Sequence, residues 1–283
     1  MLALWARSPH QRSHPGRGRL PDAQPAVGDP MKIEPLLQYL DGWLRVEEHP
    51  DYPNALNGLQ VGGPSEITTV ATAVDASEAS IRAAVEIGAD LMVVHHGLFW
   101  SGLEPVVGRH ERRLRLLFEA GLGLYSVHLP LDSHLEVGNS ALLAAALGLE
   151  VQGRLGAYAG WDIGVSGSFS EAVALEELVT RVEGAVGGGV VQVLPGGPET
   201  VRSVGVLTGG GGSFVREAAQ AGLDAYVTGE VSHHAYFDAA EFRTTVLLAG
   251  HYATETFGVK AVGRHLADRF GLQAHFIDQP TGL

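Results

Sequence analysis

Two adjacent histidines follow a short apolar stretch in the first half of the chain. Residues 91–94 read Leu-Met-Val-Val, and four apolar residues in a row predict a short strand buried on both faces. His95 and His96 come next, followed by Gly97. Open α/β sheets bind ligands beyond the carboxyl ends of their strands, which is where both imidazoles would lie. The pair alone could also be a capped turn without a ligand, so its interpretation depends on the rest of the chain.

The spacing His-x-x-x-acid then occurs twice, each time after a predicted strand. His128 precedes Asp132, and His251 precedes Glu255. If the connecting residues are helical, one helical turn separates the members of each pair. The chain has no cysteine, which excludes disulfides and thiolate ligands, so a metal must be held by His, Asp or Glu. These donors suit Zn, Fe, Mn, Co or Ni.

Two divalent ions fit this set of side chains better than one. Two imidazoles and two acids exceed what a single open site needs, and a carboxylate such as Glu255 could bridge a pair of ions. In hydrolytic sites with two metals, the ions lie roughly 3.5–4 Å apart and activate a water molecule between them. The sequence therefore predicts two divalent ions per chain.

Several other residues have a structural and a functional interpretation. Glu230 ends a predicted strand, where it could be catalytic or could cap a turn. His233 and His234 lie at a predicted helix start and are expected to be solvated rather than to bind metal. The glycine run 209–212 could hold a phosphate at a helix N-terminus, but it lacks a P-loop ending and a left-handed turn explains it equally well. The four histidines without a partner at ligand spacing are interpreted as structural: His110, His134, His265 and His275.

Hydrophobic periodicity and turn residues place these side chains on an alternation of helices and strands. A turn leading into a short strand is predicted at 57–61, and further strands are predicted at 70–74, 91–94, 124–127, 161–169, 190–194, 203–207 and 225–228. Helices are predicted at 33–44, 78–87, 111–120, 139–147, 171–186 and 213–221. Asp75 and Ser77 both offer N-cap oxygens for the helix at 78–87, and glycines follow several of the helices.

The sequence also matches itself at two offsets, one for each of two successive stretches, which indicates an internal duplication. An offset of 134 places Asp90 on Asp224, with the strand that follows each of them in register. An offset of 123 places His128 on His251 further along. We therefore predict two copies of one α/β unit, whose pairing about a pseudo-twofold axis would bring the acids and imidazoles together.

Length, composition and charge limit the class of protein. The chain of 283 residues can form two domains, which we assign to residues 31–150 and 151–283. Residues 1–30 are rich in Pro and Arg without periodicity, so they are interpreted as a disordered extension or a mis-assigned start before Met31. The net charge of −13 argues against nucleic-acid binding through a basic face. No stretch is long and apolar enough to span a membrane, and a cytoplasmic location is expected.

At these motifs, the chain from residue 31 onward resembles a known family. It is similar to the Nif-three-like dinuclear-metal-centre hexameric proteins, also known as homologues of type-2 GTP cyclohydrolase I. The motifs that carry the resemblance are NGLQ at 57–60, HHGLFWSG at 95–102, HLPLD at 128–132 with Gly138-Asn139, TGE at 228–230 and GHYATE at 250–255. They occur in order along almost the whole chain from residue 31.

The resemblance implies a fold, an assembly and a ligand set. The fold would be two similar, intertwined α/β units with mixed sheets and a metal site between them, assembled as a toroidal homohexamer. His95, His96, Asp132, His251 and Glu255 match the metal ligands of the family, with Glu255 as the bridging one. A sixth residue, His128, matches a pocket histidine near the metals.

Three functions remain open on these observations. The first is a metal-dependent hydrolase acting on a nucleotide-like small molecule, with GTP ring opening and formate release as the named reaction. There, His128 would move protons, since an imidazole with a pKa of about 6.5 suits that role, and the glycines at 209–212 would hold the triphosphate. The second is a phosphohydrolase using the same ions. The third is a metal-binding or partner-binding regulatory protein without turnover, in which the ions hold the two halves together.

Overall fold

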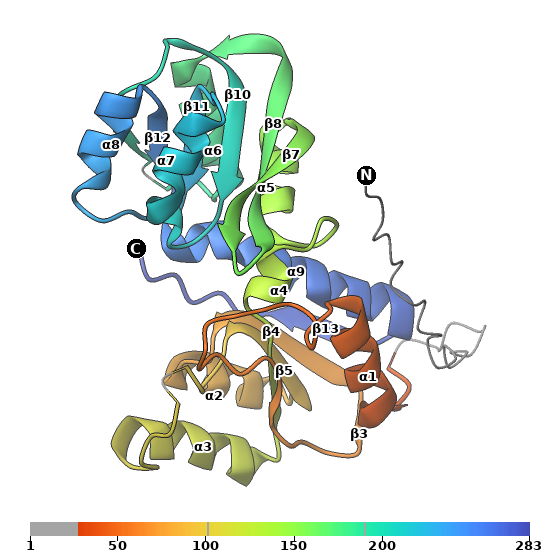
Figure 1. The fold of residues 1–283 in the computed structure, drawn as a ribbon. Coiled ribbons are helices and arrows are strands. Elements are labelled where there is room, and N and C mark those ends of the chain that lie inside the picture. The colour runs from red at the N-terminus through yellow and green to blue at the C-terminus, as the bar shows by residue number, and fades with distance from the viewer. Residues whose placement is uncertain (1–27, 101, 190) are drawn as a thin grey trace, which may run out of the picture.

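Two β-sheets covered by helices form the molecule in the computed structural model, which describes residues 28–283 except 101 and 190 (Figure 1). The lower sheet in that view consists of β13 (Gln273–Phe276), β4 (Thr69–Asp75), β5 (Leu91–His96), β6 (Gly123–Ser126) and β2 (Gly58–Val61), in spatial order. The upper sheet consists of β7 (Glu150–Tyr158), β8 (Trp161–Ala174), β10 (Thr200–Leu207), β11 (Ala225–Thr228), β12 (Thr245–Leu248) and β9 (Gln192–Leu194). A short antiparallel pair joins β1 (Met31–Lys32) to β3 (Glu66–Ile67). The predicted mixed α/β fold is confirmed.

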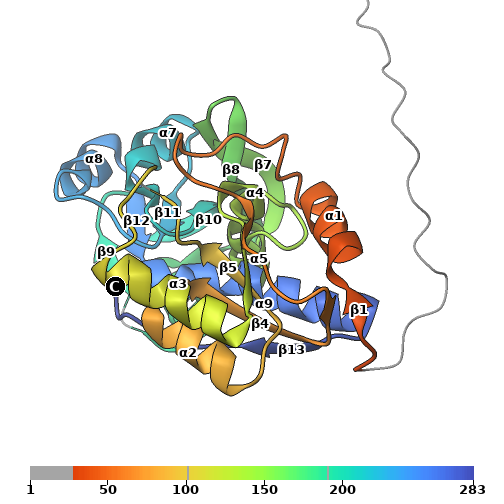
Figure 2. The same cartoon turned by 90° about the horizontal axis from the view of Figure 1, so that it is seen from below.

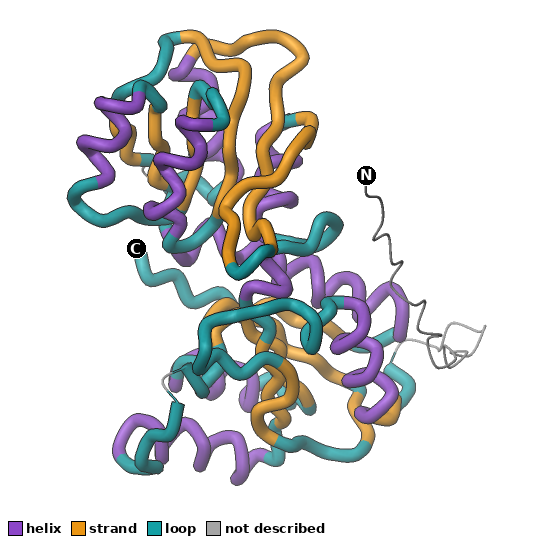
Figure 3. Tube along the Cα trace, in the orientation of Figure 1, coloured by secondary structure: helices purple, strands orange, loops and turns teal. Residues whose placement is uncertain are grey.

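Helices lie on both faces of each sheet (Figures 2 and 3). The lower sheet packs against α1 (Ile33–Trp43) and α9 (His251–Phe270) on one face and against α2 (Glu78–Glu86) and α3 (Gly108–Ala120) on the other. The upper sheet packs against α5 (Asn139–Leu147) and α6 (Leu175–Ala185), and on its other face against α7 (Val215–Gln220) and α8 (Ala235–Phe242). A single turn, α4 (Leu129–Asp132), and a 3-10 turn, η1 (Gly211–Phe214), complete the helices of the described residues. None of the described helices combines the length and apolarity of a membrane span.

Four strands of each sheet share one arrangement, as the self-matching sequence leads us to expect, whereas the next strand differs: β13 is parallel to β4 and β8 is antiparallel to β10. In the lower sheet β4, β5 and β6 are parallel and β2 is antiparallel to β6; in the upper sheet β10, β11 and β12 are parallel and β9 is antiparallel to β12. The offset of 134 places Gly58, the first residue of β2, on Gln192, the first residue of β9. The sequence match therefore coincides with a match in strand order and direction.

One hydrogen-bond pattern occurs at the same place in both sheets. Asp90 Oδ2 accepts the backbone N–H groups of Thr68 and Thr69 at 2.7 and 2.9 Å. Asp224 Oδ2 likewise accepts two consecutive N–H groups of β10, each at 2.9 Å. Each carboxylate thus ties the turn before one strand to the start of the neighbouring strand.

Each unit lends a helix to the other sheet. In α5, Leu143 and Leu147 pack in the core of the upper sheet, whereas Val259 and Leu266 of α9 pack in the core of the lower sheet. After α9 the chain adds β13 to the lower sheet, in parallel with β4. The last helix of each half thus packs on the sheet of the other half. The division into domains 31–150 and 151–283 therefore stays a prediction from the sequence.

The elements differ from the predictions at a few places. The helix predicted from 171 begins at Leu175, because β8 continues to Ala174 and pairs there with Thr200 of β10, which overrides the helix propensity of Glu171. The helix predicted at 213–221 is divided into η1 and α7. Strands β7 and β13 were not predicted, since their exposed residues weaken the apolar pattern. The prediction for residues 1–30 falls mostly on residues 1–27, outside the described residues.

We predict that Asp90→Ala lowers the free energy of unfolding by about 2–4 kcal/mol, because it leaves two backbone N–H groups without their acceptor. Asp224→Ala should cost less, about 1–2 kcal/mol, because the N–H of Arg202 that loses its acceptor there is open to water. Urea denaturation of both variants measures the effect. Glu241→Ala, at an exposed position of α8, is the matched control and should change stability by less than about 0.5 kcal/mol. Control-like stability of both aspartate variants would contradict this account.

Candidate metal centre

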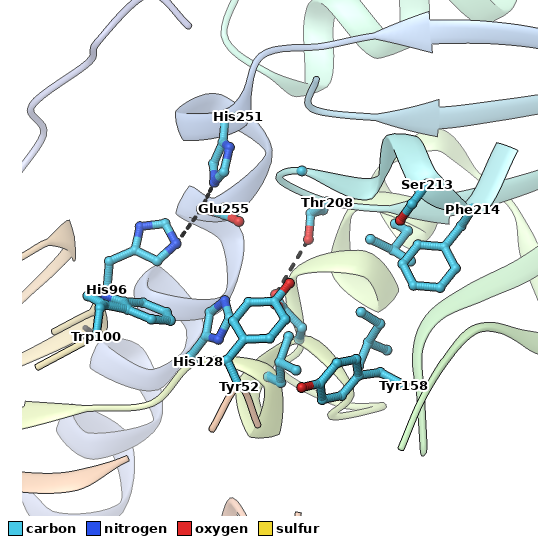
Figure 4. Close-up of a pocket in the computed structure, with 15 residues that line it drawn as sticks. Tyr52, His96, Trp100, His128, Tyr158, Thr208, Ser213, Phe214, His251 and Glu255 are labelled. Carbon is cyan, nitrogen blue, oxygen red and sulfur yellow. Dashed lines mark hydrogen bonds and ion pairs between the residues drawn. The ribbon is translucent and has the colours of Figure 1, made fainter. Parts of the chain in front are cut away.

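The five side chains predicted as metal ligands lie beside one another, and Figure 4 shows three of them, His96, His251 and Glu255. His95 and His96 are the last residues of β5, and Asp132 ends the single turn α4. His251 and Glu255 lie one turn apart at the start of α9. The helical spacing predicted from the two His-x-x-x-acid motifs is thus present in α4 and in α9.

Glu255 lies at the centre of this cluster. Its side chain is only 4% exposed, and its Oε2 is 3.2 Å from His251 Nε2 and 3.3 Å from His96 Nε2. The other oxygen, Oε1, is 3.6 Å from His95 Nε2, which in turn is 3.5 Å from Asp132 Oδ2. A carboxylate facing imidazoles with both oxygens has the arrangement that a bridging ligand requires.

The imidazoles are fixed by acceptors outside the cluster. Each of the three rings donates its Nδ1–H to an oxygen, which leaves Nε2 facing the carboxylates. The acceptors are the Val127 carbonyl for His95 at 3.0 Å, Asp75 for His96 at 2.9 Å and Glu230 for His251 at 2.8 Å. Glu230, predicted as catalytic or as a turn cap, therefore acts on the site through His251.

Buried polar atoms without partners show that the cluster fits a cation. His95 Nε2 and Glu255 Oε2 are buried, yet no described residue gives either a hydrogen bond. Leaving such groups unsatisfied is costly. Burial opposes a charged imidazole, but Asp132 and Glu255 outweigh it and raise the pKa of His95 to about 10. Burial would raise the pKa of Glu255, but His96 and His95 hold it well below its usual value. The donor set therefore suits divalent ions.

Two groups of donors within the described residues have metal-binding spacing, and they share His96. One contains His95, His96 and His128, and the other contains His96, His251 and Glu255. The structure thus supports the coarser prediction of a His/carboxylate metal site. The number and the identity of the ions stay predictions.

His128 is held by a buried aspartate that the sequence analysis missed. Asp51 Oδ1 accepts from His128 Nδ1 at 2.8 Å, and Asn57 donates to Asp51 Oδ2 at 2.9 Å while accepting the N–H of His128. Burial lowers the pKa of His128 despite Asp51, so the ring is neutral at pH 7 with Nε2 as a free acceptor. Asp51 lies in an irregular loop, and the nearby NGLQ motif was its only signal.

The cluster opens into a cavity of about 520 Å³. His96, His251 and Glu255 form one wall together with His128 (Figure 4). The aromatic side chains that line the cavity are Tyr52, Trp100, Tyr158 and Phe214. A planar ring bound between these aromatics would have its edge at the metal ligands.

The glycine run 209–212 approaches the metal centre through its backbone. The left-handed conformation suggested for the run is present at Gly209, with φ +64°, but not at the three glycines after it. A Cβ at Gly209 would overlap the Glu255 carboxylate. The N–H of Gly209 donates to Thr254 Oγ1 at 3.0 Å, and the N–H of Gly211 donates to Thr228 Oγ1 at 3.1 Å. These two amides are therefore already engaged, and the clearest role of the loop is to leave room for Glu255.

Comparison with known proteins identifies the family. The profile of the family Duf34/NIF3 (NGG1p interacting factor 3) matches residues 31–282. The chain belongs to this family. The family match begins at the residue where the resemblance seen in the sequence begins.

Proteins with similar sequences match this chain over almost their whole length. A "GTP cyclohydrolase 1 type 2 homolog" of Deinococcus radiodurans is 40% identical over 263 residues, covering 93% of this chain and 98% of the relative. A protein of the same name from Archaeoglobus fulgidus is 40% identical over 253 residues, covering 89% of this chain and 100% of the relative. The solved structure of TTHA1606 from Thermus thermophilus has a TM-score of 0.80 at 42% identity, covering 89% of this chain and 100% of that one.

We predict that Gly209→Ala abolishes high-affinity metal binding, because the added methyl group displaces Glu255 from the cluster. Calorimetric titration of the metal-free protein with Zn²⁺ measures the loss. Gly222→Ala is the matched control. Gly222 has φ +72°, so alanine there causes a similar backbone strain of about 1–2 kcal/mol, but nothing lies within 4 Å of the new methyl group. Equal Zn²⁺ affinity in both variants would show that the close approach is unimportant.

Proposed function

We propose that this DUF34/NIF3 protein is a hydrolase that depends on two divalent metal ions and opens a planar ring of a nucleotide-like small molecule. The purine ring of GTP, with release of formate, is the first candidate substrate. The observation that supports the proposal most is the buried Glu255 carboxylate, which faces three imidazoles at the edge of an aromatic cavity. The names of the curated relatives point to the same reaction class.

The residues of the chain have distinct roles in this reaction. Divalent ions, when bound, polarise the substrate and lower the pKa of water toward about 7. His128 accepts a proton at Nε2 from the water whose oxygen bonds to the imidazole carbon of the purine, and Asp51 keeps the ring oriented for that transfer. Cleavage of the two C–N bonds at that carbon consumes a second water, and the carbon leaves as formate. The aromatic side chains hold the ring in place.

The cavity recognises a ring better than a phosphate chain. Its lining by described residues contains four aromatic side chains and two carboxylates, but neither lysine nor arginine. A triphosphate would therefore find its positive partners only among the metal ions. This favours ring hydrolysis over the alternative of a phosphohydrolase.

A second function has an observation of its own. The cluster connects β5 and α4 with α9, so bound ions would join segments far apart in the chain. The protein would then be a metal-stabilised regulatory or partner-binding protein without turnover. In that case, chelation should lower the melting temperature while no substrate is hydrolysed.

The test is formate release by the metal-loaded protein, measured with a coupled formate dehydrogenase assay on GTP and on guanosine. The proposal predicts formate from at least one of them, loss of activity on chelation, and loss in Glu255→Gln. Metal-loaded protein that releases no formate from either compound would refute the proposed ring opening and favour the non-catalytic function.

We predict that Asp51→Asn lowers kcat by about 10²–10⁴-fold while the metal content is unchanged, because the amide no longer fixes the His128 ring in the tautomer that accepts a proton. Steady-state kinetics together with elemental analysis measures both quantities. Asp41→Asn is the matched control, since Asp41 accepts a hydrogen bond from Tyr125 at 2.8 Å outside the cavity. A similar loss of kcat in both variants would point to a general effect on folding.

We also propose, from the family resemblance, that the chain assembles as a homohexamer in the cytoplasm and that its partners are small molecules rather than nucleic acid. The net charge of −13 supports the last point. Light scattering should give a mass six times that of the 29.9 kDa chain. A monomeric mass would contradict the hexamer.

A further inference from the structure

A second cavity, of about 500 Å³, lies on the other side of α4 from the metal centre. The single turn α4 contributes to both cavities: Leu129 and Asp132 line the first, whereas Pro130 and the following Ser133 line the second. We call the second one the α4 cavity. Its remaining polar and aromatic walls are Trp43, Arg45, His49, His134, Glu136, Arg154 and Trp161.

Arg154 is a half-buried cation without a carboxylate partner among the described residues. Its guanidinium donates to the carbonyl of Ser133 at 3.0 Å and to the carbonyl of Asp162. Burial lowers the pKa of Arg154, and the nearby charge of Asp162 opposes that shift from beyond ion-pair distance. A partly buried charge is costly unless it is paired, and this one lines a cavity large enough for a small molecule.

His49 supplies a second unsatisfied group in the same wall. The residue is 5% exposed, and its Nδ1 donates to the Pro50 carbonyl at 2.7 Å. Its buried Nε2 has no partner among the described residues. Burial lowers the pKa of His49, which keeps the ring neutral and leaves Nε2 as a free acceptor. The α4 cavity thus has one unpaired cation and one unpaired acceptor.

Arg45 has a strained backbone that places its side chain at this cavity. It follows the end of α1 with φ +57°, a conformation that usually belongs to glycine at a helix end. Its guanidinium lies 4.5 Å from the centre of the Trp161 ring and is paired with Glu48, whose Oε2 accepts from Nη2 at 2.7 Å and from Nε at 3.0 Å. The strained backbone therefore places a guanidinium at the cavity wall with its charge already partly balanced.

We propose that the α4 cavity binds a small planar organic anion. Its carboxylate or phosphate would pair with Arg154, with Arg45, already paired with Glu48, as a second and weaker cationic contact. Its ring would lie against Trp43 and Trp161. This site is separate from the metal centre and does not depend on the proposed hydrolase activity. The chemistry that both arginines recognise is shared by carboxylates and phosphates, so the experiment includes both.

The test uses fluorine NMR of the full-length, metal-loaded protein labelled with 5-fluorotryptophan. Trp43 and Trp161 line the α4 cavity and Trp100 lines the metal cavity, so each resonance reports one location. Each resonance is assigned with a Trp→Phe variant. Benzoate and phenyl phosphate are the anionic probes, and benzyl alcohol is the uncharged one.

The proposal predicts saturable shifts of Trp43 and Trp161 with at least one anion, a response to benzyl alcohol at least tenfold weaker, and no shift of Trp100. Arg154→Gln should weaken binding at least tenfold. Arg45→Gly should also weaken binding, although its melting temperature should stay the same or rise because the left-handed strain is relieved. Arg202→Gln, an exposed arginine in β10, is the control and should bind as the wild type does.

Three results would overturn the proposal. One is the absence of any shift with either anion, as would occur if another protomer covers the cavity. The second is equal binding of benzyl alcohol, which would make the site apolar rather than anionic. The third is unchanged binding in folded Arg154→Gln and Arg45→Gly proteins. A shift confined to Trp100 would also count against it, because the anion would then occupy the metal centre.

Discussion

The structure depends on one buried carboxylate. Glu255 is almost inaccessible to solvent and is within 3.6 Å of three imidazole Nε2 atoms. A buried carboxylate charge is stable only where positive charge surrounds it, and the three imidazoles around Glu255 come from β5 and α9. Even the glycine loop before η1 follows this constraint, since it leaves the space that the carboxylate occupies.

The shared order of four strands in the two sheets helps to explain why this charge cluster lies where it does. Parallel strands of both sheets end toward the middle of the molecule, where side chains from the two units can meet (Figure 1). Helix α9 follows the last strand of the upper sheet but packs in the core of the lower sheet through Val259 and Leu266. It therefore carries side chains of the second half to the first half. Its first turn is therefore fixed against the end of β5. The cluster around Glu255 therefore forms only when α9 packs on the lower sheet, and neither unit could form it alone.

Residues that follow a strong local pattern could be predicted from the sequence. His95 and His96 follow an apolar strand, and the two His-x-x-x-acid motifs need only one helical turn, so the five side chains that cluster in the structure could be named from the sequence. That they bind metal stays a prediction. The groups that orient the ligands could not be found in this way. Asp51 contacts His128 from 77 positions away in an irregular loop, and no periodicity marks such a contact. Likewise, the reason for a glycine at position 209 is seen only in the folded structure, where the Glu255 carboxylate lies beside it.

The strands that were missed have the same explanation. The pairing of β13 with β4 joins the end of the chain to its first third, and its alternating exposed residues give a weak signal. In β8, pairing with β10 overrides a helical preference from Glu171 onward. Local propensity predicts elements whose neighbours are close in the chain, whereas contacts made by the crossover require the assembled fold.

The central claim is that the buried cluster around Glu255 holds divalent ions. The most direct measurement is elemental analysis of protein purified without chelator, for the wild type and for a variant carrying both Asp132→Ala and Glu255→Ala. The account predicts about two ions per wild-type chain and their loss from a variant that still folds. Wild-type protein that remains free of metal after reconstitution with Zn²⁺, Mn²⁺ or Fe²⁺ would contradict it.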